Sequence, residues 1–109
     1  MAFIEGSTDG VTNSTTAATI VAAPAAATRR IVKNVTITNP MATESVVLTY
    51  YLLHASETRI IWKGTLVGGE TLVDDSVRVL DGEDKYLKAV LGGIPTTQLD
   101  FSATWGDSS

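Results

Sequence analysis

Apolar and polar side chains alternate along short stretches of this chain, which is the pattern of β-strands with one buried face. Residues 29–38 show it well, because Ile31, Val35 and Ile37 fall on one face and only Lys33 breaks the pattern. Residues 98–105 alternate over their whole length. No window has a helical period over several turns, so the regular elements are expected to be strands.

Turn signals separate these stretches at intervals of about ten residues, which favours a protein made of many short strands. The expected strands are 15–21, 29–38, 45–54, 59–66, 70–74, 77–80, 86–91 and 98–105. The stretch 45–54 is apolar on both faces, so we expect it at the centre of a sandwich or against a neighbouring subunit. Gly68-Gly69 predicts a two-residue β-hairpin, because both glycines can adopt a positive φ.

This strand pattern predicts one all-β domain, an antiparallel β-sandwich of jelly-roll or immunoglobulin-like type. The length of 109 residues fits a single domain. Loop lengths permit either strand order. Residues 1–16 are rich in Gly, Ser, Thr and Asn and have little periodicity, so we expect them to form an extended N-terminal arm. Residues 17–109 are expected to form the sandwich.

The charge of the chain argues against two classes of partner. The formal net charge is −4, charged residues make up 18% of the chain, and the basic residues are scattered. A nucleic-acid binder normally presents a basic face, so neither nucleic acid nor a membrane surface is expected as a partner. The N-terminus lacks the pattern of a signal peptide, which predicts synthesis in the cytoplasm without export. Because there is no cysteine, disulfides and thiolate metal sites are excluded.

Candidate chemistry in the sequence is sparse. His54 is the only histidine, and no nucleophile motif accompanies it, so it is interpreted as a turn residue. Carboxylates cluster at 74–75 and 81–84, where Ca²⁺ is one possible ligand. Solvated turns explain these clusters better, since Asp and Gly are ordinary turn residues. We therefore predict no catalytic residue, no metal site and no cofactor.

The aromatic side chains admit two interpretations. They are Tyr50, Tyr51, Trp62, Tyr86, Phe101 and Trp105. Core packing is favoured, because alternating strands usually bury one face, whereas an exposed platform of aromatic rings would suit glycan binding. Trp105, close to the C-terminus, is also a candidate intersubunit anchor, because Trp is enriched at interface hot spots. The candidate interface residues are Phe3, Ile4, Tyr50, Trp62 and Trp105.

Four segments carry a resemblance to a known family. They are Thr-Arg-Arg-Ile-Val-Lys-Asn-Val-Thr-Ile-Thr-Asn (28–39), Val-Val-Leu-Thr-Tyr-Tyr-Leu (46–52), Ile-Ile-Trp-Lys-Gly-Thr-Leu-Val-Gly-Gly-Glu-Thr-Leu (60–72) and Val-Leu-Asp-Gly-Glu-Asp-Lys-Tyr-Leu-Lys-Ala-Val (79–90). Their order resembles that in the small β-sandwich proteins encoded among the structural genes of tailed phages. Glu83 takes the place of the acid in that family's turn pattern, and Asp84 follows it. These motifs mark turns and core positions, so no functional residue is carried over.

The resemblance implies a non-enzymatic structural protein located in a virion. A capsid decoration (cement) protein is preferred over a tail, neck, baseplate or fibre module. Its implied partners are the major capsid protein or other virion proteins, and a homo-oligomer is expected, with a trimer favoured. The alternative from a different class is a glycan- or receptor-binding module that uses Trp62, Tyr50 or Trp105.

Overall fold

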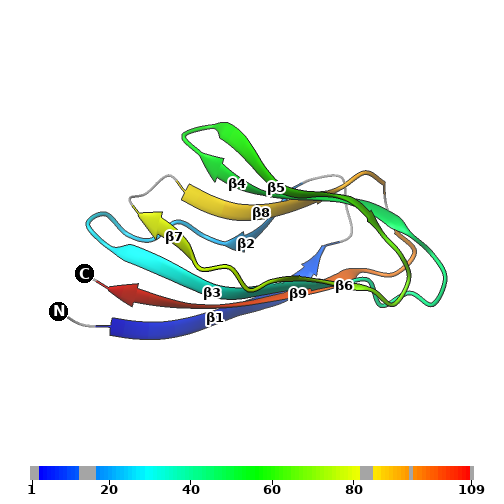
Figure 1. Ribbon diagram of the computed structural model, residues 1–109, viewed down its shortest axis with the longest axis horizontal. Coiled ribbons are helices and arrows are strands. Elements are labelled where there is room, and N and C mark those ends of the chain that lie inside the picture. The colour runs from blue at the N-terminus through cyan, green and yellow to red at the C-terminus, as the bar shows by residue number, and fades with distance from the viewer. Residues whose placement is uncertain (1–2, 13–16, 82–84, 94, 109) are drawn as a thin grey trace.

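The computed structural model describes residues 3–12, 17–81, 85–93 and 95–108. This part of the chain forms nine β-strands and no helix. The strands are β1 Phe3–Thr12, β2 Ala18–Val21, β3 Arg29–Thr38, β4 Val46–His54, β5 Glu57–Leu66, β6 Thr71–Asp74, β7 Arg78–Asp81, β8 Lys85–Leu91 and β9 Leu99–Ser108. They build two antiparallel sheets that face each other (Figure 1), which confirms the predicted all-β sandwich.

The strand order is that of a jelly roll. One sheet has the order β1-β9-β3-β6, with β7 pairing farther along the same edge of β3, and the other has the order β2-β8-β4-β5. The chain therefore changes sheet at most of its connections, and among the described strands only β4 to β5 and β6 to β7 follow each other within one sheet. The edge strands on one side of the sandwich are β1 and β2. On the opposite side the edges are β5 in one sheet and β6 and β7 in the other.

The core lies between the sheets and follows much of the predicted alternation. Leu99, Phe101 and Ala103 of β9 are buried, as their spacing predicts. In β4, which lies between β8 and β5, Leu48 and Tyr50 point into the core and are fully buried. The expectation that the stretch 45–54 is central is thus confirmed for its sheet. No helix within the described residues is long and apolar enough to span a membrane.

A β-bulge explains the irregular residue in β3. The pairing of β3 with β9 shifts register between Val32 and Asn34, so Lys33 is the extra residue. The bulge reverses which residues face the core on its N-terminal side. Val32 is therefore buried where the simple alternation predicts Ile31, which is only half-buried. The predicted inward face is correct for Val35 and wrong for Ile31.

The prediction of a hairpin at Gly68-Gly69 is wrong. The turn joins β5 of one sheet to β6 of the other, so the flanking strands do not pair. Gly69 has φ of 84° and donates its N–H to the Asn39 carbonyl at 2.9 Å. A Cβ on Gly68 would lie 2.7 Å from the Met41 carbonyl oxygen. Both glycines are required by a crossover between the sheets, and a local pattern does not distinguish this from a hairpin.

The hairpin within the β2-β8-β4-β5 sheet instead turns at Ala55 and Ser56. These two residues have φ of 50° and 70°, and His54 pairs with Glu57 on either side of them. Positive φ at both central positions is the geometry of a type I′ turn, which normally selects Asn or Gly. The sequence shows neither residue here, so the turn could not be recognised from it.

The N-terminal segment, expected as an arm, contains a strand that the pattern does not predict. β1 pairs with β9 over its whole length, from Phe3 opposite Ser108 to Thr12 opposite Leu99. Gly6 lies opposite Trp105, and a Cβ on Gly6 would come within 2.3 Å of the indole ring. The missing side chain lets β1 pack over this ring. Residues 3–12 therefore form the edge strand of their own sheet.

Candidate docking surface

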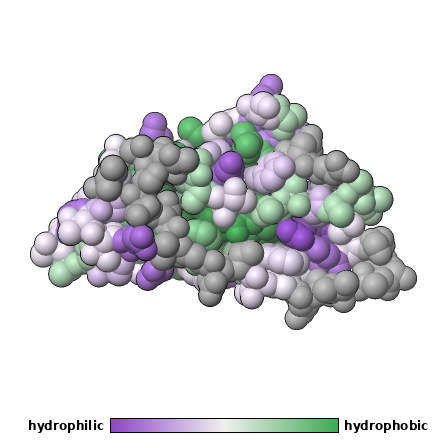
Figure 2. Space-filling model, turned by 180° about the vertical axis from the view of Figure 1, so that it is seen from behind, coloured by the Kyte–Doolittle hydropathy of each residue, from purple (hydrophilic) through white to green (hydrophobic). Residues whose placement is uncertain are grey.

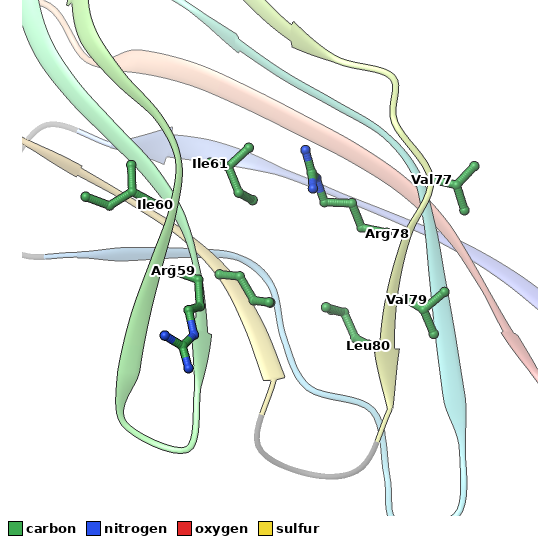
Figure 3. Close-up of a pocket in the computed structure, with 8 residues that line it drawn as sticks. Arg59, Ile60, Ile61, Val77, Arg78, Val79 and Leu80 are labelled. Carbon is green, nitrogen blue, oxygen red and sulfur yellow. The ribbon is translucent and has the colours of Figure 1, made fainter.

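A groove of about 450 Å³ opens on the side of the sandwich where β5 and β7 end their sheets. We call it the β5–β7 groove. Its lining residues are Leu52, Arg59, Ile60, Ile61, Val77, Arg78, Val79 and Leu80. Figure 3 shows Ile61, Arg78 and Leu80 pointing into the gap between the strands. The pairing of β4 with β5 shifts register between Tyr50 and Tyr51, so Ile61 is the extra residue of a β-bulge in β5.

The rims of the groove expose apolar surface. Ile60 is 57% exposed, Val77 is 68% exposed and Val79 is 45% exposed, and Figure 3 shows all three pointing away from the gap. Exposed apolar side chains on both strands beside an apolar groove are typical of a surface that binds another protein. The groove is therefore the candidate functional site.

Two arginines supply the charge of the groove. No acidic residue is among the eight described residues that line it. Arg59 contacts Glu57 at 2.7 Å, with 64% and 67% of the two side chains exposed. Such an exposed ion pair contributes little to stability, so Arg59 can readily replace Glu57 by a carboxylate of another chain as its partner. Arg78 is held more firmly, because its Nε lies 2.6 Å from the Asp74 carboxylate, whose side chain is only 9% exposed.

Asp74 ties together the wall of the groove on the β7 side. Its Oδ2 accepts hydrogen bonds from Tyr50 Oη at 2.8 Å and from Arg78 Nε at 2.6 Å. Its Oδ1 accepts a bond from the Ser76 N–H at 3.2 Å. Because Tyr50 belongs to β4 and Asp74 to β6, this network joins the two sheets across the core. It also fixes the position of Arg78 in the groove.

The same network determines the ionisation of its members. Burial by itself raises the pKa of Asp74, but the hydrogen bonds from Arg78 and Tyr50 and the charge of Arg78 outweigh it, so the pKa is lowered overall. The pKa of Tyr50 is raised, first by burial and then by its bond to the Asp74 carboxylate. Asp74 is thus a carboxylate at neutral pH, and Tyr50 is a neutral donor.

Two of the predicted interface residues lie in the sheet of β4 and β5. Tyr50 is fully buried and belongs to the core, so its ring does not reach the surface of this fold. Trp62 lies opposite Tyr50 on β5 and is half-buried against the core. A Cβ on Gly64 would lie 3.2 Å from the Trp62 ring, so the glycine leaves room for it. This pair provides packing rather than an exposed aromatic platform.

The other predicted interface residues lie in the other sheet. Trp105 is half-buried, with the Arg30 guanidinium 3.9 Å from its ring centroid. Arg30 also binds Asp107 through two hydrogen bonds, of 2.8 Å and 3.0 Å. Phe3 and Ile4 lie in β1, opposite Ser108 and Asp107, and their side chains are outside the described residues. The five candidates therefore divide between the two sheets.

The carboxylate clusters form no metal site in the described part of the chain, where no group of three His, Cys, Asp or Glu side chains is placed to hold an ion. Asp74 accepts the bonds described above, and Asp81 pairs with Lys85 at 2.6 Å. Residues 82–84 of the second cluster lie outside the described residues. His54 lies at the end of β4 and is half-buried.

Hydroxyl groups and scattered apolar side chains make up much of the remaining surface. Thr36 and Ser102 share a hydrogen bond of 2.9 Å across β3 and β9, and Thr38 and Thr71 share one of 2.9 Å across β3 and β6. Figure 2 shows apolar side chains reaching the middle of the face opposite to that of Figure 1, between polar ones.

Sequence reasoning did not identify the β5–β7 groove. Its strands were expected, and Ile60, Val77 and Val79 resemble ordinary core positions of an alternating strand. They are exposed because β5 and β7 are edge strands of different sheets, which only the strand order shows. The sequence of residues 77–80, in which Arg78 separates two valines, gives no signal that these valines stay exposed.

No protein-family model matches this sequence, and no curated protein does so. Among solved structures, a chain of the disulfide-linked pili that form Bacillus endospore appendages matches with a TM-score of 0.54 and 13% identity, covering 96% of this chain and 85% of that chain. A chain of the cyanophage Pam1 capsid asymmetric unit matches with a TM-score of 0.44 and 13% identity, covering 95% of this chain and 82% of that chain. The similarity to the pilus chain shows a shared fold.

Proposed function

We propose that this chain is a non-enzymatic structural subunit of a virion, and specifically a capsid decoration protein that binds the assembled head of a tailed phage. The observation that carries the proposal is the β5–β7 groove, with its exposed apolar rims at Ile60, Val77 and Val79. An apolar surface flanked by two edge strands fits contact with another protein chain. The proposed partners of the subunit are the major capsid protein and neighbouring copies of this chain.

Decoration requires binding and no reaction. A protein that binds the assembled shell but not its free subunits stabilises the shell by mass action. The polar network around Asp74 joins the two sheets, which suits a rigid subunit. A rigid subunit loses little conformational entropy when it binds, so more of its contact energy stabilises the shell.

The fold and the sequence resemblance support the same proposal. Jelly rolls are recurrent in viral capsid domains and in lectins. The four segments of residues 28–90 resemble small structural proteins of tailed phages. The fold shared with a pilus chain is compatible with a repeating assembly.

Immunogold electron microscopy tests the proposal directly. Antibodies against the purified chain are applied to virions of the phage that encodes it. Labelling over the whole head surface is expected. Labelling confined to the tail, neck, baseplate or fibres would replace decoration by one of those roles, and the absence of the chain from washed virions would contradict a virion subunit.

The glycan-binding alternative has a separate test. Trp62 and Trp105 are half-buried and Tyr50 is buried, so these residues form no exposed platform for a sugar. We expect no change in tryptophan fluorescence when the chain is titrated with a broad panel of glycans. A saturable change with one glycan would favour a receptor-binding module over decoration.

A further inference from the structure

We propose that the β5–β7 groove binds the N-terminal edge strand β1 of a second copy of this chain, so that copies associate head to tail. This inference rests on the proposed function in one respect, namely that the chain works in an assembly. It adds the identity of one partner surface and the direction of the contact.

The two surfaces lie on opposite sides of the sandwich. β1 ends the β1-β9-β3-β6 sheet on one side, and the groove opens between β5 and β7 on the other. One copy can therefore use both surfaces at once, with one neighbour on each side. In this arrangement β1 stays paired within its own sheet, and binding requires no rearrangement of either domain.

The strands match in length and in type. β1 and β5 each contain ten residues, and each ends its sheet. An edge strand carries unpaired backbone groups along its outer side, which makes it a template for a strand from another chain. β7 contains only four residues, so it leaves part of the opposite wall of the groove open.

Charge favours β1 as the occupant. β1 contains Glu5 and Asp9 and no basic residue, whereas the charged residues that line the groove are Arg59 and Arg78. Two whole copies repel each other, because each has a formal net charge of −4. Arg78 is already paired with the nearly buried Asp74, so Arg59 is the charge in the groove that can exchange its present partner for an acidic residue of another copy. Arg59 is suited to this exchange, because its present pair with Glu57 is exposed.

A head-to-tail contact repeats the same interface from copy to copy. Such heterologous interfaces close into a ring when the rotation between copies permits it, and otherwise they form a filament. A threefold ring would be the trimer that the sequence resemblance implies.

Sedimentation velocity of the full chain over a wide concentration range measures the association. We expect mass to increase with concentration. The double variant Ile60→Ser with Val77→Ser removes apolar side chains from both rims and should weaken association by about tenfold or more. The matched control is Val67→Ser with Val73→Ser, which removes two valines of 45% and 55% exposure that do not line the groove. Circular dichroism and thermal melts verify that both variants fold.

A charge exchange identifies the occupant. Arg59→Glu alone and Glu5→Arg alone should each weaken association, and the two changes in one chain should restore it. Lys63→Glu is the control, since Lys63 is an exposed residue of β5 that does not line the groove. Restoration in the double variant is expected only if Glu5 of one copy contacts Arg59 of another.

A wild-type chain that remains a monomer at every concentration would overturn the inference, as would equal weakening by the groove and control variants. Association that depends on the groove but is not restored by the charge exchange would also overturn it, because the occupant would then be another segment. These outcomes are independent of the proposed function. A monomer that still labels phage heads leaves decoration in place, and a groove-dependent oligomer that is absent from virions removes decoration alone.

Discussion

The carboxylate of Asp74 joins side chains that are far apart in the sequence and belong to different sheets. The sequence suggests a solvated turn at this position, but Asp74 is the last residue of β6 and its side chain is only 9% exposed. Its bonds to Tyr50 and Arg78 could not be predicted, because they depend on how β4 and β6 face each other. The same limit applies to Tyr50, which is an interface candidate in the sequence and a core residue in the fold.

Stability should fall at low pH because of Asp74. The pKa of this carboxyl is lowered in the folded chain, while in the unfolded chain it is about 3.9. The stabilisation it provides is therefore complete well above pH 4 and is lost as the pH falls through that value toward the lower folded pKa. Urea unfolding between pH 7 and pH 3 measures this loss.

Asp74→Asn should reduce that pH dependence and lower stability at neutral pH. Asp100→Asn is the comparison, because Asp100 is an exposed carboxylate outside this network. Glu44 and Asp81 also have lowered pKa values, so part of the pH dependence should remain in Asp74→Asn. Equal pH slopes for Asp74→Asn and the wild type would show that Asp74 has no role in the acid sensitivity.

Tyr50→Phe should destabilise the chain by about 1 to 2 kcal/mol, since it removes a hydrogen bond to a charged acceptor and leaves Asp74 with one donor fewer. The ring itself stays in the core, so the change measures the bond between the sheets. Urea unfolding at pH 7 gives the difference. A free energy of unfolding equal to that of the wild type would show that this bond does not contribute.

At the scale of elements, alternation predicted most strands, whereas turn chemistry predicted one hairpin wrongly, at Gly68-Gly69, and gave no signal for the hairpin at Ala55-Ser56. The stretch 29–38 was predicted with its observed bounds, yet its bulge at Lys33 was not, because a bulge depends on the partner strand. β1 was missed because its Gly- and Ser-containing sequence becomes a strand only through pairing with β9. Local patterns identify strands that have a buried apolar face. Edge strands that lack such a face can be recognised only from the tertiary structure.

Gly69→Ala should destabilise the chain by about 1 kcal/mol. Gly69 has φ of 84°, which an alanine rarely adopts, and nothing lies within 4 Å of an added Cβ. The cost is therefore one of backbone conformation alone. Gly93→Ala is the matched control, since an added Cβ there also meets nothing within 4 Å and no positive φ is involved. Thermal unfolding should lower the midpoint for Gly69→Ala only.

Gly6→Ala should loosen the pairing of β1 with β9. The added Cβ would come within 2.3 Å of the Trp105 ring, which Arg30 covers on its other side. Such a clash costs about 1 to 3 kcal/mol unless the strand or the ring moves. Hydrogen exchange should show faster exchange in β1 and β9 than in β4 and β8. Unchanged exchange in β1 would mean that the ring adapts without disturbing the strand.

At the scale of the whole molecule, composition and strand spacing were sufficient for the fold class. They could not choose between jelly-roll and immunoglobulin-like order, because that choice depends on which strands pair across the sandwich. Composition and strand spacing could not predict the candidate site for the same reason. The groove exists because β5 and β7 end different sheets on one side of a molecule 47 Å long, a relation that no local pattern contains.

The proposed role of this sandwich is that of a subunit on the surface of a phage head. Cryo-electron microscopy of virions purified from the phage proposed to encode it is a direct test. Density is expected on the outside of the shell into which both sheets fit, with the β5–β7 groove covered by a neighbouring chain. A head surface without such density, in virions that contain no copy of the chain by mass spectrometry, would contradict it.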